Sequence, residues 1–139
     1  MIVRQLSVFL ENKSGYLDKV LSLLAMNKID IKAVFISDTR EYGILRILVS
    51  NPDEALNVLL NNGFSAKLNK VLCFEVSTEI GSFAKAAECF SKENLNIEYL
   101  YGFSVYDKAI AVMRTNDPEK ALEIISKNNI KLVTEADLQ

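Results

Sequence analysis

An internal repeat with a spacing of 66 residues constrains the fold of this chain more than any other feature. When the sequence is shifted against itself, the register holds without a gap from Leu6 over Leu72 to Lys67 over Val133. The identical pairs include Leu6 and Leu72, Gly15 and Gly81, Ile31 and Ile97, Ile44 and Ile110, Pro52 and Pro118, Ala55 and Ala121, Leu56 and Leu122, and Asn62 and Asn128. They fall at expected core and turn positions, as the duplication of one structural unit requires.

Each copy has the apolar periodicity of a strand, a helix, two strands, a helix and a strand. In the first copy we expect strands at 3–10, 31–37, 43–49 and 65–70, and helices at 15–27 and 52–62. Leu21 is expected in the core. The short turn between the middle strands predicts an antiparallel hairpin, and the helices form the outer crossovers. We therefore predict an α+β fold of two ferredoxin-like βαββαβ repeats side by side, domains 1–69 and 70–139, with antiparallel sheets and helices on one face.

A glycine turn joins the first strand of each copy to its helix, at Gly15 and at Gly81. Glycine permits a close approach of the main chain, and the helix that follows presents free amide groups and the positive end of its dipole. A carboxylate can bind there without any catalytic residue. The turns 12–17 and 78–83 are therefore candidate ligand sites.

The composition argues against several classes of function. The net charge of −2, from 16 basic and 18 acidic residues, gives no electrostatic footprint for nucleic acid or an anionic membrane surface. The chain has no histidine, and Cys73 and Cys89 lie far from any second metal-type ligand, so we expect free thiols, no metal and no cofactor. No apolar run approaches the roughly 20 residues of a membrane span, and no signal-peptide pattern opens the chain. We therefore expect a soluble, cytoplasmic protein.

The third strand of the first copy is apolar on both faces. It carries Ile44, Leu45, Ile47, Leu48 and Val49, interrupted by Arg46 alone. A sheet with two apolar faces needs a cover on the side away from its helices. We therefore expect sheet-on-sheet packing with a second chain, in a homodimer.

The stretch 12–17 (Asn-Lys-Ser-Gly-Tyr-Leu), with Asp30 and Ile31 opening the second strand, resembles the signature of an ACT domain. That signature is Asp or Asn, any residue, Pro, Gly, any residue, Leu. ACT domains are ferredoxin-like regulatory modules that bind free amino acids or other small ligands, commonly attached to enzymes such as aspartokinase and phosphoglycerate dehydrogenase. The resemblance covers nearly the whole chain, as two ACT domains in tandem without a catalytic domain.

The resemblance implies that a ligand binds between the turn of one module and the start of the second strand in its neighbour. Asn12 takes the acid or amide position and Gly15 the glycine position. With the copies side by side, Asn12 would face Asn96, and Thr78 would face Asp30, which gives two unequal sites. The implied ligand-binding residues are Asn12, Ser14, Gly15, Tyr16, Leu17, Asp30, Ile31, Thr78, Ile80, Gly81, Ser82, Phe83, Asn96 and Ile97.

These residue types suit an amino acid, which is a fixed pair of opposite charges. Its carboxylate can accept hydrogen bonds from the backbone amides of a turn, and its ammonium can donate to Asn12, Asn96 or Asp30, at about 1.5 to 3 kcal/mol for each bond to a charged group. Ser14 stands where proline is usual, and the second turn departs at both the acidic and the proline positions. Each residue also suits a turn or a cap, which leaves a purely structural role open.

We therefore expect a non-catalytic, allosteric sensor of free amino acids that regulates amino-acid metabolism. The alternative is a ligand-free dimeric scaffold, or an accessory subunit of an amino-acid biosynthetic enzyme such as a branched-chain synthase. RNA binding is disfavoured because the stretch 40–47 is aliphatic where an RNA-binding sheet of this topology carries aromatic residues. Enzyme activity is disfavoured because there is no histidine, nucleophile elbow or phosphate loop, and 11–15 lacks the arginine of an acylphosphatase loop.

Overall fold

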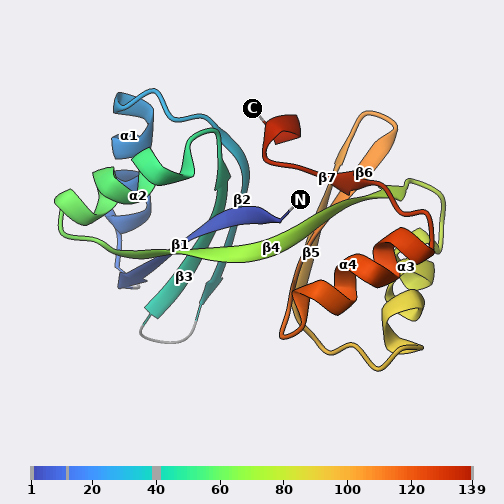
Figure 1. The fold of residues 1–139 in the computed structure, drawn as a ribbon. Coiled ribbons are helices and arrows are strands. Elements are labelled where there is room, and N and C mark those ends of the chain that lie inside the picture. The colour runs from blue at the N-terminus through green and yellow to red at the C-terminus, as the bar shows by residue number, and fades with distance from the viewer. Residues whose placement is uncertain (1, 12, 39–41, 139) are drawn as a thin grey trace. The chain divides into compact units, whose positions relative to one another are not determined.

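The computed structural model describes residues 2–11, 13–38 and 42–138. Its elements (Figure 1) are β1 (Val3–Glu11), α1 (Tyr16–Met26), β2 (Ile31–Asp38), β3 (Tyr42–Val49), α2 (Pro52–Asn61), β4 (Ser65–Ser77), α3 (Ser82–Ser91), β5 (Ile97–Val105), β6 (Lys108–Thr115), α4 (Pro118–Lys127), β7 (Leu132–Val133) and the 3-10 helix η1 (Ala136–Leu138). Contacts divide the chain into two compact units. The first unit is Arg4–Asn69 with Leu138, and the second is Lys70–Asp137 with residues 2 and 3.

The first unit is an antiparallel sheet with its helices on one face. Strands β2, β3 and β1 follow one another in that order, and Glu11 at the end of β1 pairs with Tyr42 at the start of β3. The first part of β4 lies beside β1, where Ser7 Oγ donates a hydrogen bond to Asn69 Oδ1 at 2.7 Å. Helices α1 and α2 cover the same side of these strands (Figure 1).

The second unit repeats this plan. Its strands follow the order β5, β6, β4, β7, all antiparallel, with Leu72 opposite Met113 and Cys73 opposite Val133. Tyr106, with a φ of 56°, lies in the tight turn between β5 and β6. Helices α3 and α4 lie together on one face of this sheet (Figure 1). The predicted pair of ferredoxin-like βαββαβ repeats is confirmed.

Each unit buries its own apolar core between helices and sheet. The first core contains Leu6, Val8, Leu10, Val20, Leu24, Ile29, Leu45, Ile47, Val49, Ala55 and Leu59. The second contains Leu72, Phe74, Val76, Phe90, Leu95, Ala109, Ala111, Met113, Ala121, Ile124 and Ile125. Leu24 and Phe90, 66 residues apart, are both fully buried. The core prediction for Leu21 was wrong: α1 buries Val20 and Leu24, whereas Leu21 is half-buried and outside the cluster.

Strand β4 differs from the prediction because it runs unbroken from Ser65 to Ser77, where we expected a strand ending at residue 70. Its 13 residues contain neither glycine nor proline, so nothing in the sequence ends the strand early. The same strand therefore contributes residues to both units.

Helices α2 and α4 begin with side-chain caps. Asn51 Oδ1 accepts a hydrogen bond from the amide of Glu54 at 3.3 Å, and Asp117 Oδ1 accepts one from the amide of Lys120 at 3.1 Å. A proline follows each cap at the first helical position. These two helix starts are thus satisfied by the chain itself.

Candidate functional site

Helices α1 and α3 begin differently, at a glycine in the left-handed backbone region. Gly15 has a φ of 94° and Gly81 of 89°, and neither helix has a side-chain cap hydrogen bond. An added Cβ at either position would meet no atom within 4 Å, so the backbone conformation alone requires glycine. Both helix starts therefore lack the side-chain acceptor that α2 and α4 have. The Tyr16 amide donates to the Lys13 carbonyl at 3.5 Å and the Ser82 amide to the Glu79 carbonyl at 3.2 Å, so the other amides of each start are the ones that could bind a carboxylate.

The remaining residues of the first turn divide between solvent and core. Asn12, the predicted acceptor, lies outside the described residues. Ser14 and Leu17 are exposed. Tyr16 is half-buried and packs against the core of the first unit.

The second turn has more contacts within its own unit. Thr78 Oγ1 donates a hydrogen bond to the backbone oxygen of Asp107 at 3.5 Å. Phe83 lies against β5, because a Cβ built on Gly102 would come within 2.8 Å of its ring. Ile80 is fully exposed. A structural contact therefore accounts for Thr78 and Phe83, whereas none accounts for Ile80.

The two residues that open the second strands have different surroundings. Asp30 Oδ2 accepts a 2.6 Å hydrogen bond from Lys32 Nζ, and this bond lowers the pKa of the carboxyl below its usual value. The Asp30 amide donates to Ser50 Oγ at 3.0 Å. The Asn96 backbone oxygen accepts from Thr115 Oγ1 at 2.8 Å, while its exposed side chain has no hydrogen bond within the described part of the chain. The side-chain oxygen of Asn96 is therefore more available than the Asp30 carboxylate to accept a hydrogen bond from a ligand.

The turn and the strand start of one unit lie at opposite ends of its sheet. On β3, Tyr42 is opposite Glu11 at the turn end, and Val49 is opposite Ile31 at the strand start. These positions are seven residues apart, about 23 Å at roughly 3.3 Å per residue. The second unit has the same separation along β6, and Ile97, like its counterpart, packs against the core. Among the described residues, neither unit brings its own turn and its own strand start together.

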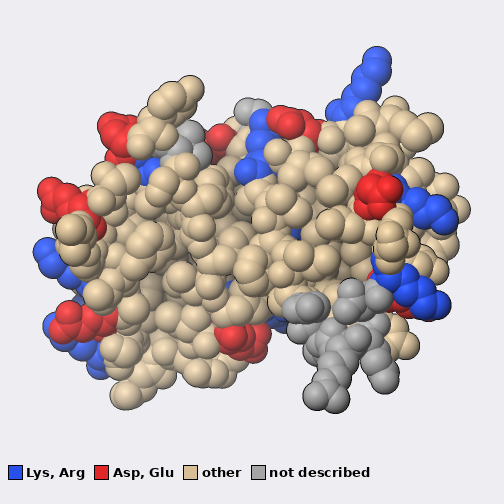
Figure 2. Space-filling model, turned by 180° about the vertical axis from the view of Figure 1, so that it is seen from behind, with Lys and Arg blue, Asp and Glu red and all other residues tan. Residues whose placement is uncertain are grey.

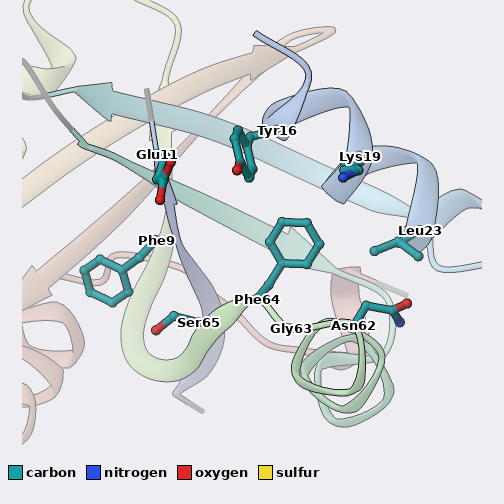
Figure 3. Close-up of a pocket in the computed structure, with 9 residues that line it drawn as sticks. All are labelled: Phe9, Glu11, Tyr16, Lys19, Leu23, Asn62, Gly63, Phe64 and Ser65. Atoms are coloured by element: carbon teal, nitrogen blue, oxygen red, sulfur yellow. The ribbon is translucent and has the colours of Figure 1, made fainter. Parts of the chain in front are cut away.

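A cavity of about 510 Å³ opens in the first unit beside the turn (Figure 3). It is lined by Phe9, Glu11, Tyr16, Lys19, Leu23, Asn62, Gly63, Phe64 and Ser65. Phe64 projects from the turn after α2 toward α1, where its ring lies between Tyr16 and Leu23 (Figure 3). Of the residues that line this cavity, Tyr16 is the one that the sequence analysis named as ligand-binding.

A smaller cavity, about 290 Å³, occupies the matching place in the second unit. Its lining is Glu75, Val76, Ser77, Glu79, Ser82, Lys85, Ala86, Cys89, Asn128 and Ile130. At the repeat spacing of 66, Lys85 corresponds to Lys19 and Asn128 to Asn62. The asparagines have a structural explanation, since each donates from Nδ2 to a helix carbonyl four residues earlier, at 2.7 Å for Asn62 and 2.8 Å for Asn128. Neither the Lys19 nor the Lys85 side chain has a hydrogen bond or an ion pair among the residues that the structure describes.

Cys73 and Cys89 should react with thiol reagents at very different rates. Cys73 is fully buried, and this burial raises its pKa to about 12, whereas Cys89 is half-buried and lines the second cavity. Iodoacetamide at pH 8 should alkylate Cys89 first and Cys73 only on unfolding, as followed by mass spectrometry. Comparable rates would contradict the burial of Cys73.

Because an unfolded thiol ionises near pH 8.5, the burial of Cys73 also makes the folded state lose stability as the pH rises from there toward 12.

Residues 1–139 match the family profile described as an ACT domain pair. The chain belongs to this ACT family. A crystal structure of protein BT0572 from Bacteroides thetaiotaomicron is similar to this ACT pair, with 36% identity and a TM-score of 0.96, over 99% of this chain and 96% of that one.

Two regulatory subunits of aspartate kinase share the fold of this ACT pair. The subunit from Thermus thermophilus, in a ligand-free form, is 19% identical with a TM-score of 0.66, over 89% of this chain and 91% of that one. The subunit from Thermus flavus is 17% identical with a TM-score of 0.64, over 89% and 90%. The search of curated proteins found no match.

ACT domains are regulatory modules rather than catalytic ones. Within residues 2–11, 13–38 and 42–138 of this ACT pair, no three Cys, Asp or Glu residues are placed to hold a metal ion. None of the helices in those ranges is long and apolar enough to cross a membrane.

Analysis of the sequence missed most of the cavity in the first unit of the ACT pair. Lys19 and Leu23 come from α1, and Phe64 from the turn after α2, so only the folded chain brings them together. One signal was available: Lys19 has an identical partner, Lys85, at the repeat spacing, although neither occupies a core position.

Proposed function

We propose that this ACT pair is a non-catalytic sensor of free amino acids that regulates amino-acid metabolism. The observation that carries the proposal is the pair of helix starts at Gly15 and Gly81, both in the left-handed region, both without a side-chain cap and both in ACT repeats. An amino acid's carboxylate would accept hydrogen bonds from the amides of these turns. Its ammonium would then need an oxygen acceptor from a second element.

The acceptors would come from another repeat, because each unit's own strand start lies at the far end of its sheet. We assign Asn12 and Asn96 to one pocket, and Thr78 and Asp30 to the other. The first is the stronger candidate, since the Asn96 side chain is available whereas Asp30 is already bonded to Lys32. The two repeats would have to pair side by side, in one chain or between chains.

A second copy of the chain and a biosynthetic enzyme are the partners in this proposal. Edge strand β2 exposes apolar side chains, with Val34 55% and Ile36 47% accessible. Such residues on an edge strand favour an intermolecular contact. Regulatory subunits of aspartate kinase with the same fold support control of a separate enzyme, and they equally support the alternative of a ligand-free accessory subunit.

A thermal-shift titration with each of the twenty amino acids tests the proposal. At a hundredfold excess over the dissociation constant, a ligand that binds the folded state adds about 2.7 kcal/mol of stability. Asn96→Ala should weaken this shift without lowering the melting temperature of the free protein, because Asn96 is exposed and outside the helices and strands. Asn12→Ala should weaken the shift as well. Asn61→Ala, an exposed position on α2, is the control and should bind normally. If no amino acid raises the melting temperature, the accessory-subunit alternative is favoured.

A further inference from the structure

Each of the two cavities has a lysine without an acidic partner at its edge. On much of the side drawn in Figure 2, basic side chains lie near acidic ones. Several lysines form ion pairs within the described residues, such as Lys127 Nζ with Glu93 Oε1 at 3.2 Å. In contrast, neither Lys19 nor Lys85 has a carboxylate within 4.0 Å among the residues that the structure describes. An ammonium group without such a partner is available for an anionic ligand.

The cavity of the first unit combines this positive charge with an apolar wall. Tyr16, Leu23 and Phe64 are partly buried and packed on the core, so the wall is continuous with the interior of the unit. Lys19 Nζ lies 5.9 Å from the centroid of the Tyr16 ring, within the range of a cation–π contact. The ammonium group is therefore held beside the aromatic wall (Figure 3).

The acidic residue of the same cavity is already paired. Glu11 Oε2 lies 3.3 Å from Lys13 Nζ, so its negative charge is offset by a lysine that does not line the cavity. The charge left for a ligand at this cavity is that of Lys19. An anion is favoured there over a cation.

Volume and charge distinguish the two cavities. The first, about 510 Å³, falls in the range of roughly 300 to 1,000 Å³ that is typical of small-molecule sites, whereas the second, about 290 Å³, falls at its lower limit. The lining of the second has no aromatic residue, and it contains Glu79, which has no ion pair among the described residues. Its other acidic residue, Glu75, lies 3.4 Å from both Lys108 Nζ and Lys131 Nζ. The matching cavity of the second unit is therefore the weaker candidate, and it provides an internal control.

We propose that the first unit carries a ligand site of its own, which shares Tyr16 with the turn but uses no strand start, for a small carboxylate with a flat apolar body. The carboxylate pairs with Lys19, and the apolar body lies against Phe64, Tyr16 and Leu23. Every contact comes from within one unit, so the site needs neither the other repeat nor a second chain. It does not depend on the proposed function, which places the carboxylate of an amino acid on the backbone amides of the turn rather than on Lys19.

An NMR titration of the full-length, 15N-labelled chain with phenylacetate tests this site. We expect saturable shifts of the amides of Lys19, Phe64 and Ser65, with a dissociation constant on the order of 1 mM for so small a ligand. Phenethylamine, which has the same ring and the opposite charge, should not saturate these amides. Absence of saturation by phenylacetate, or equal binding of the amine, would overturn the proposal.

Substitution at the lysine separates recognition of the carboxylate from general apolar binding. Lys19→Gln should weaken phenylacetate binding about fivefold, the upper limit for an exposed ion pair, while Lys19→Arg should retain it. Lys85→Gln, the matched change in the second unit, should leave the affinity unchanged. An unaltered affinity in Lys19→Gln, with a spectrum showing the intact fold, would contradict the assignment.

The same spectra distinguish this proposal from the amino-acid sensor. If phenylacetate saturates the cavity but no amino acid shifts the turn amides, the cavity site is supported and the sensor is contradicted. If an amino acid shifts the turns while phenylacetate shifts nothing at the cavity, the opposite holds.

Discussion

Phe90→Ala is expected to lower the free energy of unfolding by about 3 to 5 kcal/mol. The Phe90 ring is fully buried in the core of the second unit, and its centroid lies 5.7 Å from that of Phe74, with the ring planes at 51°. Removing the ring leaves a cavity and ends an aromatic contact, which itself contributes roughly 0.5 to 1.5 kcal/mol. Urea denaturation followed by circular dichroism measures the change.

The repeat supplies a matched variant for this measurement. Leu24 occupies the position equivalent to Phe90 in the first unit and is also fully buried, so Leu24→Ala should cost about 2 to 5 kcal/mol. Met26→Ala, on the same helix but 78% exposed, should change stability by less than about 0.5 kcal/mol. A loss below about 1 kcal/mol in Phe90→Ala would be inconsistent with the core described for the second unit.

Gly15→Val should both destabilise the first unit and weaken amino-acid binding at its turn. A β-branched residue at a φ of 94° costs at least about 1 to 2 kcal/mol, and no steric clash adds to this, because an added Cβ would meet no atom within 4 Å. If the backbone leaves the left-handed region, the turn amides no longer point at one carboxylate, so affinity should fall at least about tenfold. Denaturation and calorimetric titration measure the two effects.

Gly15→Asn is the matched control at the same position. Asparagine enters the left-handed region more readily than other residues with a side chain, so this variant should lose less stability than Gly15→Val and keep measurable affinity. If both variants bind the amino acid like the original chain, the turn is not a ligand site.

The fold could be predicted from the sequence because its strongest signals are local and occur twice. In both copies, a glycine marks the start of the first helix, at Gly15 and Gly81. A cap residue followed by proline marks the start of the second helix, α2 or α4. The continuous strand β4 was not predicted because the chain passes from the first unit to the second within this strand, and no turn residue marks that point. Leu21 was misplaced because helical spacing fixes the apolar stripe of α1 but not its edges.

The candidate sites were less accessible to sequence analysis. The glycine turns were found because a positive φ has a specific residue preference. The ion pair of Asp30 with Lys32 could not be predicted from the sequence because it depends on side-chain conformation. The contact of Phe83 with Gly102 depends on how α3 packs on β5. The cavity that Lys19 shares with Phe64 needs both helices of the unit in place.

The central claim is that a turn of one repeat and a strand start of another hold the same amino acid. NMR titration of the labelled chain with the amino acid that gives the largest thermal shift tests it most directly. The account predicts that the amides of Gly15 to Leu17 and of Asn96, or those of Gly81 to Phe83 and of Asp30, shift together with one dissociation constant. Shifts confined to a turn or to a strand start, or shifts in neither, would contradict it.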